Sequence, residues 1–152
     1  ALVWGGPRPR TDRIAGNIGR SARNRKKMAV LLRGTTRGKA AVTHYSTTAT
    51  YPHCSEIECR LETGRTHQIR VHMAHIGAPL IGDPTYGKNR GIKAFGSGDR
   101  FIEATTLARS FERQALHAAS LGFVHPVTGE DIFAEAPLPP DMDELLAALR
   151  AM

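Results

Sequence analysis

The densest group of polar residues lies between Arg60 and His72, in the stretch RLETGRTHQIRVH. Arg65 stands between a predicted strand and the start of a predicted helix, where free backbone N–H groups and the helix dipole favour an anion. A guanidinium can hold a phosphate or a carboxylate through two parallel hydrogen bonds. Arg65 is therefore a candidate anion-binding residue, although an arginine that only ties a strand to its neighbour would show the same pattern.

Three histidines in the same region raise the question of a metal site. His72 and His75 are three residues apart and can share a helix face, whereas His67 lies five residues before His72 and points elsewhere. The sequence has no HExxH pattern, and the predicted helix contains no carboxylate. We therefore expect no metal site and no cofactor, and we assign these histidines to packing or to hydrogen bonds with a binding partner.

Asp83 lies in the glycine-rich stretch GDPTYG at 82–87 and could be mistaken for a nucleophile. An aspartate before a proline and between glycines is first of all a turn residue, because its carboxylate accepts hydrogen bonds from the backbone that follows. We predict a structural role for Asp83.

Basic residues are concentrated in the first 39 positions. Eleven of the 21 Lys and Arg residues lie there against one acidic residue, Asp12, so this segment carries +10, whereas the rest has ten basic and thirteen acidic residues, or −3. This asymmetry is typical of a surface that meets nucleic-acid phosphate, although a merely solvated basic face has the same composition. The candidates for phosphate contact are Arg20, Arg23, Arg25, Lys26 and Lys27.

Alternation of apolar and polar residues predicts the strands. From Glu56 to Glu62, Ile57, Cys59 and Leu61 face one way and charged residues the other, which indicates a half-buried strand. The segment Gly5–Lys27, rich in Gly, Pro, Arg and Asn, is expected to be a surface loop. Further strands are expected at 1–4, 28–32 and 41–50, with a turn at 51–53 and a hairpin whose arms, 116–124 and 132–136, flank HPVTGE.

Capping signals predict two helices. Thr66 is expected to cap a helix that runs to Ile76 and stops at Gly77, with Ile69, Met73 and Ile76 facing the core. A second helix is expected from Asp141, with Glu144 completing a capping box. Its apolar stripe would consist of Met142, Leu145, Leu146 and Leu149.

The remaining segments complete the predicted architecture. Gly77–Gly87 is expected to be a structured loop, and Lys88–Arg100 to be mobile. The order of elements predicts an α+β fold, an antiparallel or mixed sheet with flanking helices. A chain of 152 residues is long enough for one domain with its own core.

The sequence shows no sign of membrane insertion or secretion. No apolar run approaches the ~20 residues that span a bilayer, and no secretory signal is visible. The two cysteines, Cys54 and Cys59, are five residues apart and would point to opposite faces of a strand, so we expect reduced thiols. We therefore expect a cytoplasmic protein without a membrane partner.

The stretch Arg60–His72, followed by MAHIG at 73–77 and GDPTYG at 82–87, resembles the signature of the RluA family of RNA pseudouridine synthases. Within that family it is most similar to the branch that acts on large-subunit rRNA. The resemblance covers nearly the whole chain and is weakest from Lys88 to about Thr106. It includes Ile18–Arg20, Arg25–Val30, Gly38–Tyr45, Arg113–Ala118, His125–Pro126 and Ala136–Pro137.

The resemblance implies isomerisation of uridine in RNA: the glycosidic bond is broken and the base is reattached through carbon, after the nucleotide leaves its helix. Arg65 matches the arginine that pairs with the family's catalytic aspartate, which a neighbouring guanidinium keeps ionised. That aspartate belongs to an HRLD motif that is absent here. Ala1 and Val3 match a stretch that follows a tyrosine in the family. We therefore expect residues 1–152 to be the C-terminal portion of a catalytic domain, inactive alone.

Three functional hypotheses follow. The first is part of an rRNA pseudouridine synthase, an isomerase; the second is a non-catalytic RNA-binding module on the same scaffold. Both need RNA as partner, and in both we expect His67 and Gln68 to contact it together with the basic run. A third, a histidine-metal hydrolase, would require zinc in stoichiometric amount.

Overall fold

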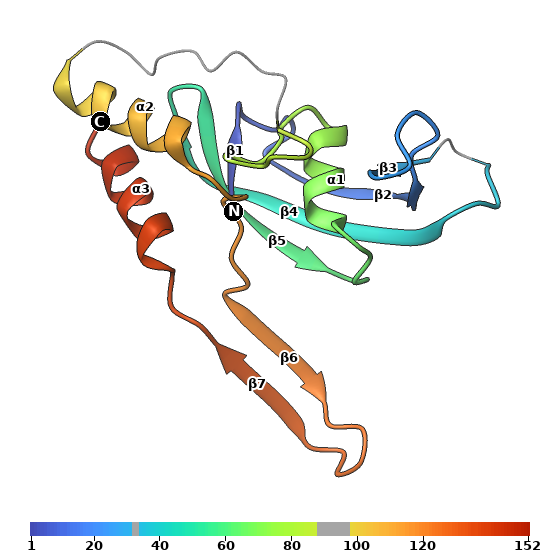
Figure 1. Ribbon diagram of the computed structural model, residues 1–152. Coiled ribbons are helices and arrows are strands. Elements are labelled where there is room, and N and C mark those ends of the chain that lie inside the picture. The colour runs from blue at the N-terminus through green and yellow to red at the C-terminus, as the bar shows by residue number, and fades with distance from the viewer. Residues whose placement is uncertain (32–33, 88–97) are drawn as a thin grey trace.

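The computed structural model describes residues 1–31, 34–87 and 98–152, and its main feature is a curved five-stranded sheet (Figure 1). The strand order is β1-β5-β4-β2-β3, and every neighbouring pair is antiparallel. The α+β prediction is thus confirmed, with an antiparallel sheet in the described part of the chain. The strands are β1 Leu2–Trp4, β2 Thr11–Arg20, β3 Met28–Val30, β4 Lys39–Tyr51 and β5 Cys54–Leu61.

Strands β4 and β5 form the long hairpin that the sequence predicts, with its turn after Tyr51. Alternation explains the inward face of β5, where Ile57 is buried and Cys59 is half-buried, but Leu61 at the far end is 48% exposed. A register shift between Thr47 and Ala49 accommodates one extra residue in β4. The predicted strands at β1 and β3 are also confirmed.

Strand β2 corrects the prediction of a surface loop over Gly5–Lys27. Ten of these residues form the strand, which pairs with β4 on one side, and the end of β2 pairs with β3 on the other. Its core contribution is limited to Ile14 and Ile18, which are 8% and 2% exposed, so the strand shows almost no alternation in sequence. Its backbone hydrogen bonds come from two neighbouring strands, and this tertiary pairing overrides a weak local preference.

Helix α1, Gln68–His75, begins later than predicted, and Thr66 does not cap it. The N-cap position is occupied by His67, in the left-handed region with φ 56°, without a side-chain cap hydrogen bond. The helix ends as predicted, because Gly77 adopts φ 82° and its N–H reaches the carbonyl of Ala74.

The buried face of α1 also differs from the predicted stripe. Met73 is buried as expected, but Ile69 is only partly buried and Ile76 is 36% exposed. The residues that face the sheet instead are Gln68, Val71, His72 and Met73. Two of these four are polar, because β4 offers Thr43 as a hydrogen-bond partner at this point.

Helices α2, Asp99–Ser110, and α3, Pro140–Arg150, pack together at the β1 end of the molecule (Figure 1). The predicted apolar stripe of α3 is buried there with Leu2 and Trp4. The predicted capping box is wrong, because Pro139 occupies the N-cap and the Asp141 carboxylate binds Arg113. Helix α2 was not predicted; the predicted mobile segment lies outside the described residues, except for 98–100.

Strands β6, Ser120–Val124, and β7, Asp131–Glu135, form the predicted hairpin. It is a separate two-stranded sheet that projects from the body of the protein (Figure 1). Its apolar side chains, including Leu121, Phe123, Val124 and Phe133, remain exposed. In the described ranges, no helix is both long and apolar enough to span a membrane.

His72, on the buried face of α1, is the most deeply buried ionisable residue of that helix. Its side chain is fully buried, and Nδ1 lies 2.9 Å from the hydroxyl oxygen of Thr43. Within the described part of the chain, Nε2 has no hydrogen-bond partner. Burial and, to a lesser degree, the nearby charge of His75 lower the pKa of His72 to about 4.

Acidification should therefore destabilise the fold through His72. The pKa of this histidine is 6.5 in the unfolded chain and about 4 in the folded chain, so the stabilisation is complete above pH 6.5 and is lost as the pH falls towards 4. Between pH 7 and 4.5 we expect a loss on the order of 2 kcal/mol from this residue. Urea unfolding at both pH values measures it, with His72→Gln as control. Equal losses in the two proteins would contradict the prediction.

Candidate functional site

Gln68, the first residue of α1, organises the loop that carries Arg65. Its Oε1 accepts hydrogen bonds from the Arg65 N–H at 2.9 Å and from the Thr63 hydroxyl at 2.7 Å. Its Nε2 donates to the carbonyl of Val42 at 2.9 Å and to the hydroxyl of Thr43 at 3.0 Å. The side chain is only 3% exposed, so Gln68, predicted to contact RNA, holds the loop against β4.

Arg65 is half-buried where β5 has ended and α1 has not yet begun. Its Nε donates to the carbonyl of Ala40 at 2.9 Å, which anchors the guanidinium beside the start of β4. Among the residues that the structure describes, no carboxylate forms an ion pair with it. The anchored group is therefore placed to pair with an anion from outside this set.

His67 follows two residues later and is exposed. Its Nδ1 lies 3.0 Å from the hydroxyl oxygen of Tyr86, and the two rings meet edge to face with centroids 5.8 Å apart. Its carbonyl accepts the N–H of Val71, which begins the hydrogen-bond ladder of α1. The left-handed backbone thus places the His67 side chain beside the loop that contains Tyr86.

That loop is fastened to α1 by an ion pair between Arg70 and Asp83. Two hydrogen bonds of 2.8 Å join the guanidinium and the carboxylate, whose side chains are 11% and 0% exposed. The same carboxylate accepts the N–H groups of Thr85 and Tyr86. Burial would raise the pKa of Asp83, but the Arg70 guanidinium and these two N–H groups outweigh it and hold that pKa below its ordinary value. The predicted turn role is confirmed; the pair with Arg70 was not predicted.

The segment from Arg20 to Met28, the basic turn, connects β2 to β3 and contacts the same loop. A guanidinium N–H of Arg20 donates to the carbonyl of Arg25 at 2.9 Å, inside the turn. The ammonium group of Lys27 donates to the carbonyl of Thr85 at 2.6 Å, and the N–H of Met28 donates to the Tyr86 hydroxyl at 3.0 Å. The turn is therefore tied to the loop that Asp83 holds in place.

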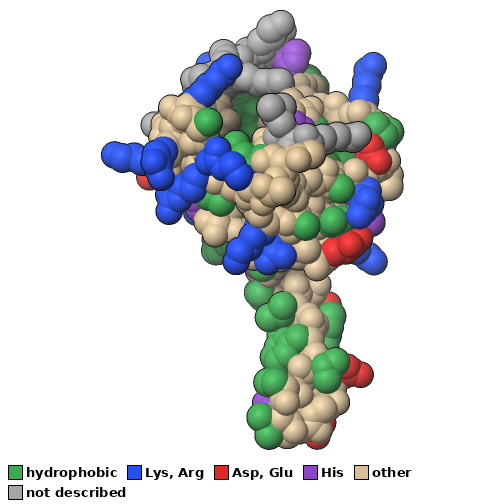
Figure 2. Space-filling view, turned by 90° about the vertical axis from the view of Figure 1, so that its right-hand side faces the viewer, with side chains coloured by type: hydrophobic (Ala, Val, Ile, Leu, Met, Phe, Trp, Pro, Cys, Tyr) green, Lys and Arg blue, Asp and Glu red, His purple; other side chains and the backbone are tan. Residues whose placement is uncertain are grey.

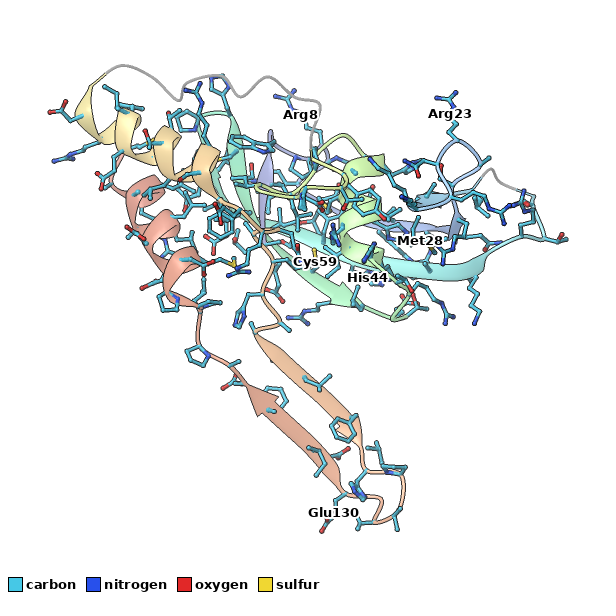
Figure 3. The ribbon with its side chains drawn as sticks, viewed as in Figure 1. Arg8, Arg23, Met28, His44, Cys59 and Glu130 are labelled. Carbon is cyan, nitrogen blue, oxygen red and sulfur yellow. The ribbon has the colours of Figure 1, made fainter. Side chains whose placement is uncertain are left out.

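The predicted phosphate contacts divide into two kinds. Arg20, Arg23, Arg25 and Lys26 are exposed, whereas Lys27 is half-buried and occupied by its bond to the loop. Arg23 points outward from the turn (Figure 3). Lys and Arg side chains gather over the main body on the face shown in Figure 2, and hydrophobic side chains lie along the projecting hairpin below.

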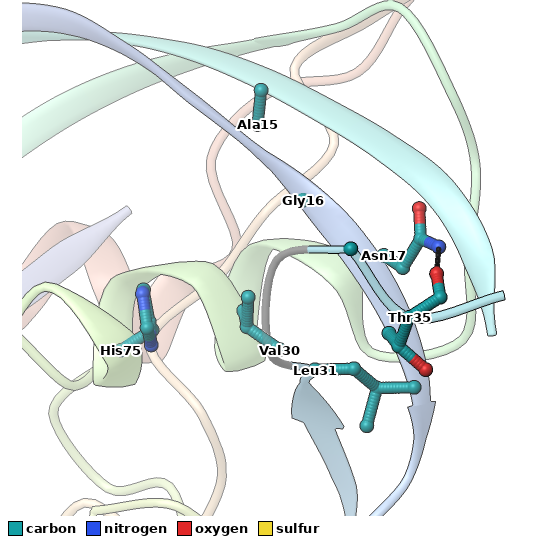
Figure 4. A pocket seen from close by; sticks show the side chains of 8 residues that line it. Ala15, Gly16, Asn17, Val30, Leu31, Thr35 and His75 are labelled. Atoms are coloured by element: carbon teal, nitrogen blue, oxygen red, sulfur yellow. Dashed lines mark hydrogen bonds between the residues drawn. The ribbon is translucent and has the colours of Figure 1, made fainter. Parts of the chain in front are cut away.

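Two further features do not join this site. A hollow of about 440 Å³ lies between β2, β3 and the end of α1, beside His75, where the Asn17 amide donates to the carbonyl of Thr35 (Figure 4). None of the predicted site residues lines it. In the described ranges, no group of three or more His, Cys, Asp or Glu side chains could hold a metal ion.

Comparison with known proteins agrees with this arrangement. A family described as RNA pseudouridylate synthase matches residues 6–75. Proteins named Ribosomal large subunit pseudouridine synthase D from Zymomonas mobilis and Neisseria meningitidis are 48% and 49% identical over 87% and 93% of this chain. These alignments cover 38% and 36% of the relatives, so the chain spans less than half of their length.

Solved structures show the same fold. Human RNA Pseudouridylate Synthase Domain Containing 4 superimposes with a TM-score of 0.70 at 22% identity, over 99% of this chain and 60% of its own. Human RNA Pseudouridylate Synthase Domain Containing 1 gives 0.67 at 27% identity, over 100% and 64%. The chain belongs to the RluA family of RNA pseudouridine synthases.

Removing the Asp83 carboxylate should destabilise the protein strongly. Asp83→Ala leaves the Arg70 guanidinium buried without its partner, and breaking a buried pair costs about 3–5 kcal/mol. Asp141→Ala is the matched control, because it removes an exposed bidentate pair with Arg113, and exposed pairs contribute little. Chemical unfolding of both variants measures the difference. Equal losses would show that the Asp83 pair does not hold the site together.

Proposed function

We propose that this chain forms part of an enzyme that isomerises uridine to pseudouridine in RNA, with large-subunit rRNA as substrate. The observation that carries the proposal is the anchored Arg65, which is fixed by Gln68 and by the Ala40 carbonyl and has no acidic partner among the described residues. Relatives named for large-subunit rRNA support the choice of substrate.

In this proposal Arg65 pairs with a catalytic aspartate from a preceding segment of a longer protein. A guanidinium beside a carboxylate favours the ionised form and orients it by a bidentate hydrogen bond. An ionised, oriented carboxylate can act as a nucleophile or as a base on a uridine that has left the RNA helix. Arg65 positions and binds, but the covalent or proton-transfer step belongs to the aspartate.

The β6–β7 hairpin supports the assignment of residues 1–152 to the C-terminal portion of a catalytic domain. A two-stranded hairpin is marginally stable alone, and this one exposes Leu121 on β6 and Phe133 on β7 at 60% and 69%. In a longer protein, a preceding part of the same chain would cover these side chains. The length of the relatives, more than twice the matched region, leaves room for such a part.

The RNA contacts that we propose follow the basic turn. Arg20, Arg23, Arg25 and Lys26 are exposed and can approach phosphates, and Lys27 holds the turn in place. The Tyr86 hydroxyl contacts both Met28 and His67, so His67 lies beside the basic turn. Gln68 is buried and supports the site through its hydrogen bond to the carbonyl of Val42. A bacterial rRNA-modifying role and two free thiols support a cytoplasmic location.

Arg65 should be required for turnover in the longer protein. Arg65→Ala should reduce pseudouridine formation by about a thousandfold or more, with RNA affinity nearly unchanged, because the lost interaction acts on the aspartate. Arg65→Lys should also be impaired, since an ammonium group cannot form the bidentate pair. Arg60→Ala, an exposed arginine on β5, is the control.

Single-turnover pseudouridine formation and RNA binding, measured on the same preparations, test the assignment. Near-normal turnover of Arg65→Ala would overturn the role of Arg65. Pseudouridine formation by residues 1–152 alone would overturn the assignment of the aspartate to another segment. RNA binding without turnover by the longer wild-type protein would favour a non-catalytic RNA-binding module.

Two exposed cations of the basic turn should contribute to RNA affinity through counterion release. Replacing both Arg23 and Lys26 by Ala should weaken binding and lower the slope of log K against log salt by about 1–2. The control replaces Arg100 and Arg109 of α2, which changes the net charge equally at the opposite end of the molecule (Figure 1). Titrations at several salt concentrations measure the slope. An unchanged slope in the turn variant would remove these residues from the interface.

A further inference from the structure

The hydroxyl group of Tyr86 joins the basic turn to the candidate site. The Met28 N–H, at the end of the turn, and the Nδ1 of His67, at the start of α1, both lie 3.0 Å from it. Met28 and His67 are far apart in sequence and belong to different elements. One oxygen atom therefore sets the position of the basic turn relative to His67.

The hydrogen-bond pattern favours one form of the His67 ring. A backbone N–H can only donate, so the Tyr86 oxygen accepts from Met28, and its single proton remains to be donated. Among the described residues, His67 Nδ1 is the acceptor that the hydroxyl reaches. A ring that accepts at Nδ1 carries its proton on Nε2 when it is neutral. The second ring nitrogen of His67 is then a hydrogen-bond donor, on an exposed side chain.

The position of the Tyr86 hydroxyl is itself determined by buried groups. The Arg70 guanidinium carbon lies 5.0 Å from the centre of the Tyr86 ring, and the Asp83 carboxylate accepts the Tyr86 N–H at 3.0 Å. The edge-to-face contact with His67 fixes the remaining side of the ring. The hydroxyl is therefore held in place before any ligand arrives, as preorganised recognition requires.

We propose that Tyr86 holds His67 as its Nε2–H tautomer beside the basic turn, so that His67 donates a hydrogen bond to a phosphate oxygen of the bound RNA. The inference rests on the proposed RNA-binding function and names a residue pair for it. Phosphate is the ligand because the neighbouring exposed side chains, Arg20, Arg23, Arg25 and Lys26, are all cationic and draw the backbone of RNA to this surface. A neutral donor adds direction to these contacts without adding charge.

The tautomer is tested in the free protein. A nitrogen-correlated NMR spectrum at pH 8 should show His67 with its proton on Nε2, identified by loss of its signals in His67→Asn. Asparagine is the replacement because it tolerates the left-handed backbone. Tyr86→Phe keeps the ring and removes the hydroxyl, so the His67 signals should shift towards a mixture of tautomers. Tyr51→Phe, a tyrosine beside Arg150, is the matched control.

The ligand is tested by RNA binding at several salt concentrations, with a fragment of large-subunit rRNA as probe. His67→Asn should weaken binding about tenfold or more, the range of one hydrogen bond to a charged group. Tyr86→Phe should weaken binding less, because part of its His67 rings keeps the proton on Nε2. The slope of log K against log salt should stay at the wild-type value, because a neutral donor releases no counterion. The double variant should lose less affinity than the sum of the two single variants, since Tyr86 acts in part through His67 and in part through the Met28 N–H.

The outcomes separate the inference from the proposed function. A wild-type His67 spectrum in Tyr86→Phe, or losses of affinity that add in the double variant, would overturn the inference and leave RNA binding intact. A reduced salt slope in His67→Asn would show a charged contact and overturn the neutral donor. A wild-type protein that binds no RNA would overturn the proposed interface and the phosphate contact together, whatever the NMR spectrum shows.

Discussion

The buried ion pair between Arg70 and Asp83 is the interaction on which the site depends. The two charges are removed from water and compensate each other, so removal of either partner would leave the other charged and buried. The carboxylate also satisfies two backbone N–H groups, so the turn at 83–86 can bury its polar atoms. Because Thr85 and Tyr86 then contact the basic turn, a single carboxylate fixes segments from three parts of the chain.

The site is built as a rigid frame that orients groups for partners outside it. Gln68 satisfies the polar groups beneath the Arg65 loop, and Tyr86 connects α1 to the basic turn. The groups that remain exposed, the cations of the turn and His67, suit an anionic polymer. Arg65, by contrast, is half-buried and anchored, which suits pairing with one carboxylate. Burial thus separates the arginines that suit binding of an anionic polymer from the one that suits pairing with a carboxylate.

The errors of the sequence-based predictions share one physical cause. Strand β2 has only Ile14 and Ile18 in the core, and its stability comes from hydrogen bonds with neighbouring strands. Helix α1 starts at Gln68 because the His67 backbone turns left-handed towards Tyr86, a contact that Thr66 as a cap would not provide. Helix α3 starts without its capping box because Asp141 binds Arg113 instead. In each case a partner outside the local segment outweighed a local preference.

The sequence by itself determined the elements with strong local signals and provided the candidate residues for chemistry. Strict alternation located β5, the stop at Gly77 ended α1, and the spacing of Arg65 and Asp83 identified the family. Only the tertiary structure decided which of these residues hold other segments in place and which are exposed and can contact a ligand. Gln68 proved to be buried and saturated, Lys27 to hold a loop, and Tyr86 to join two segments. Burial and hydrogen-bond partners depend on chain segments brought together by folding, and residue type and spacing do not encode them locally.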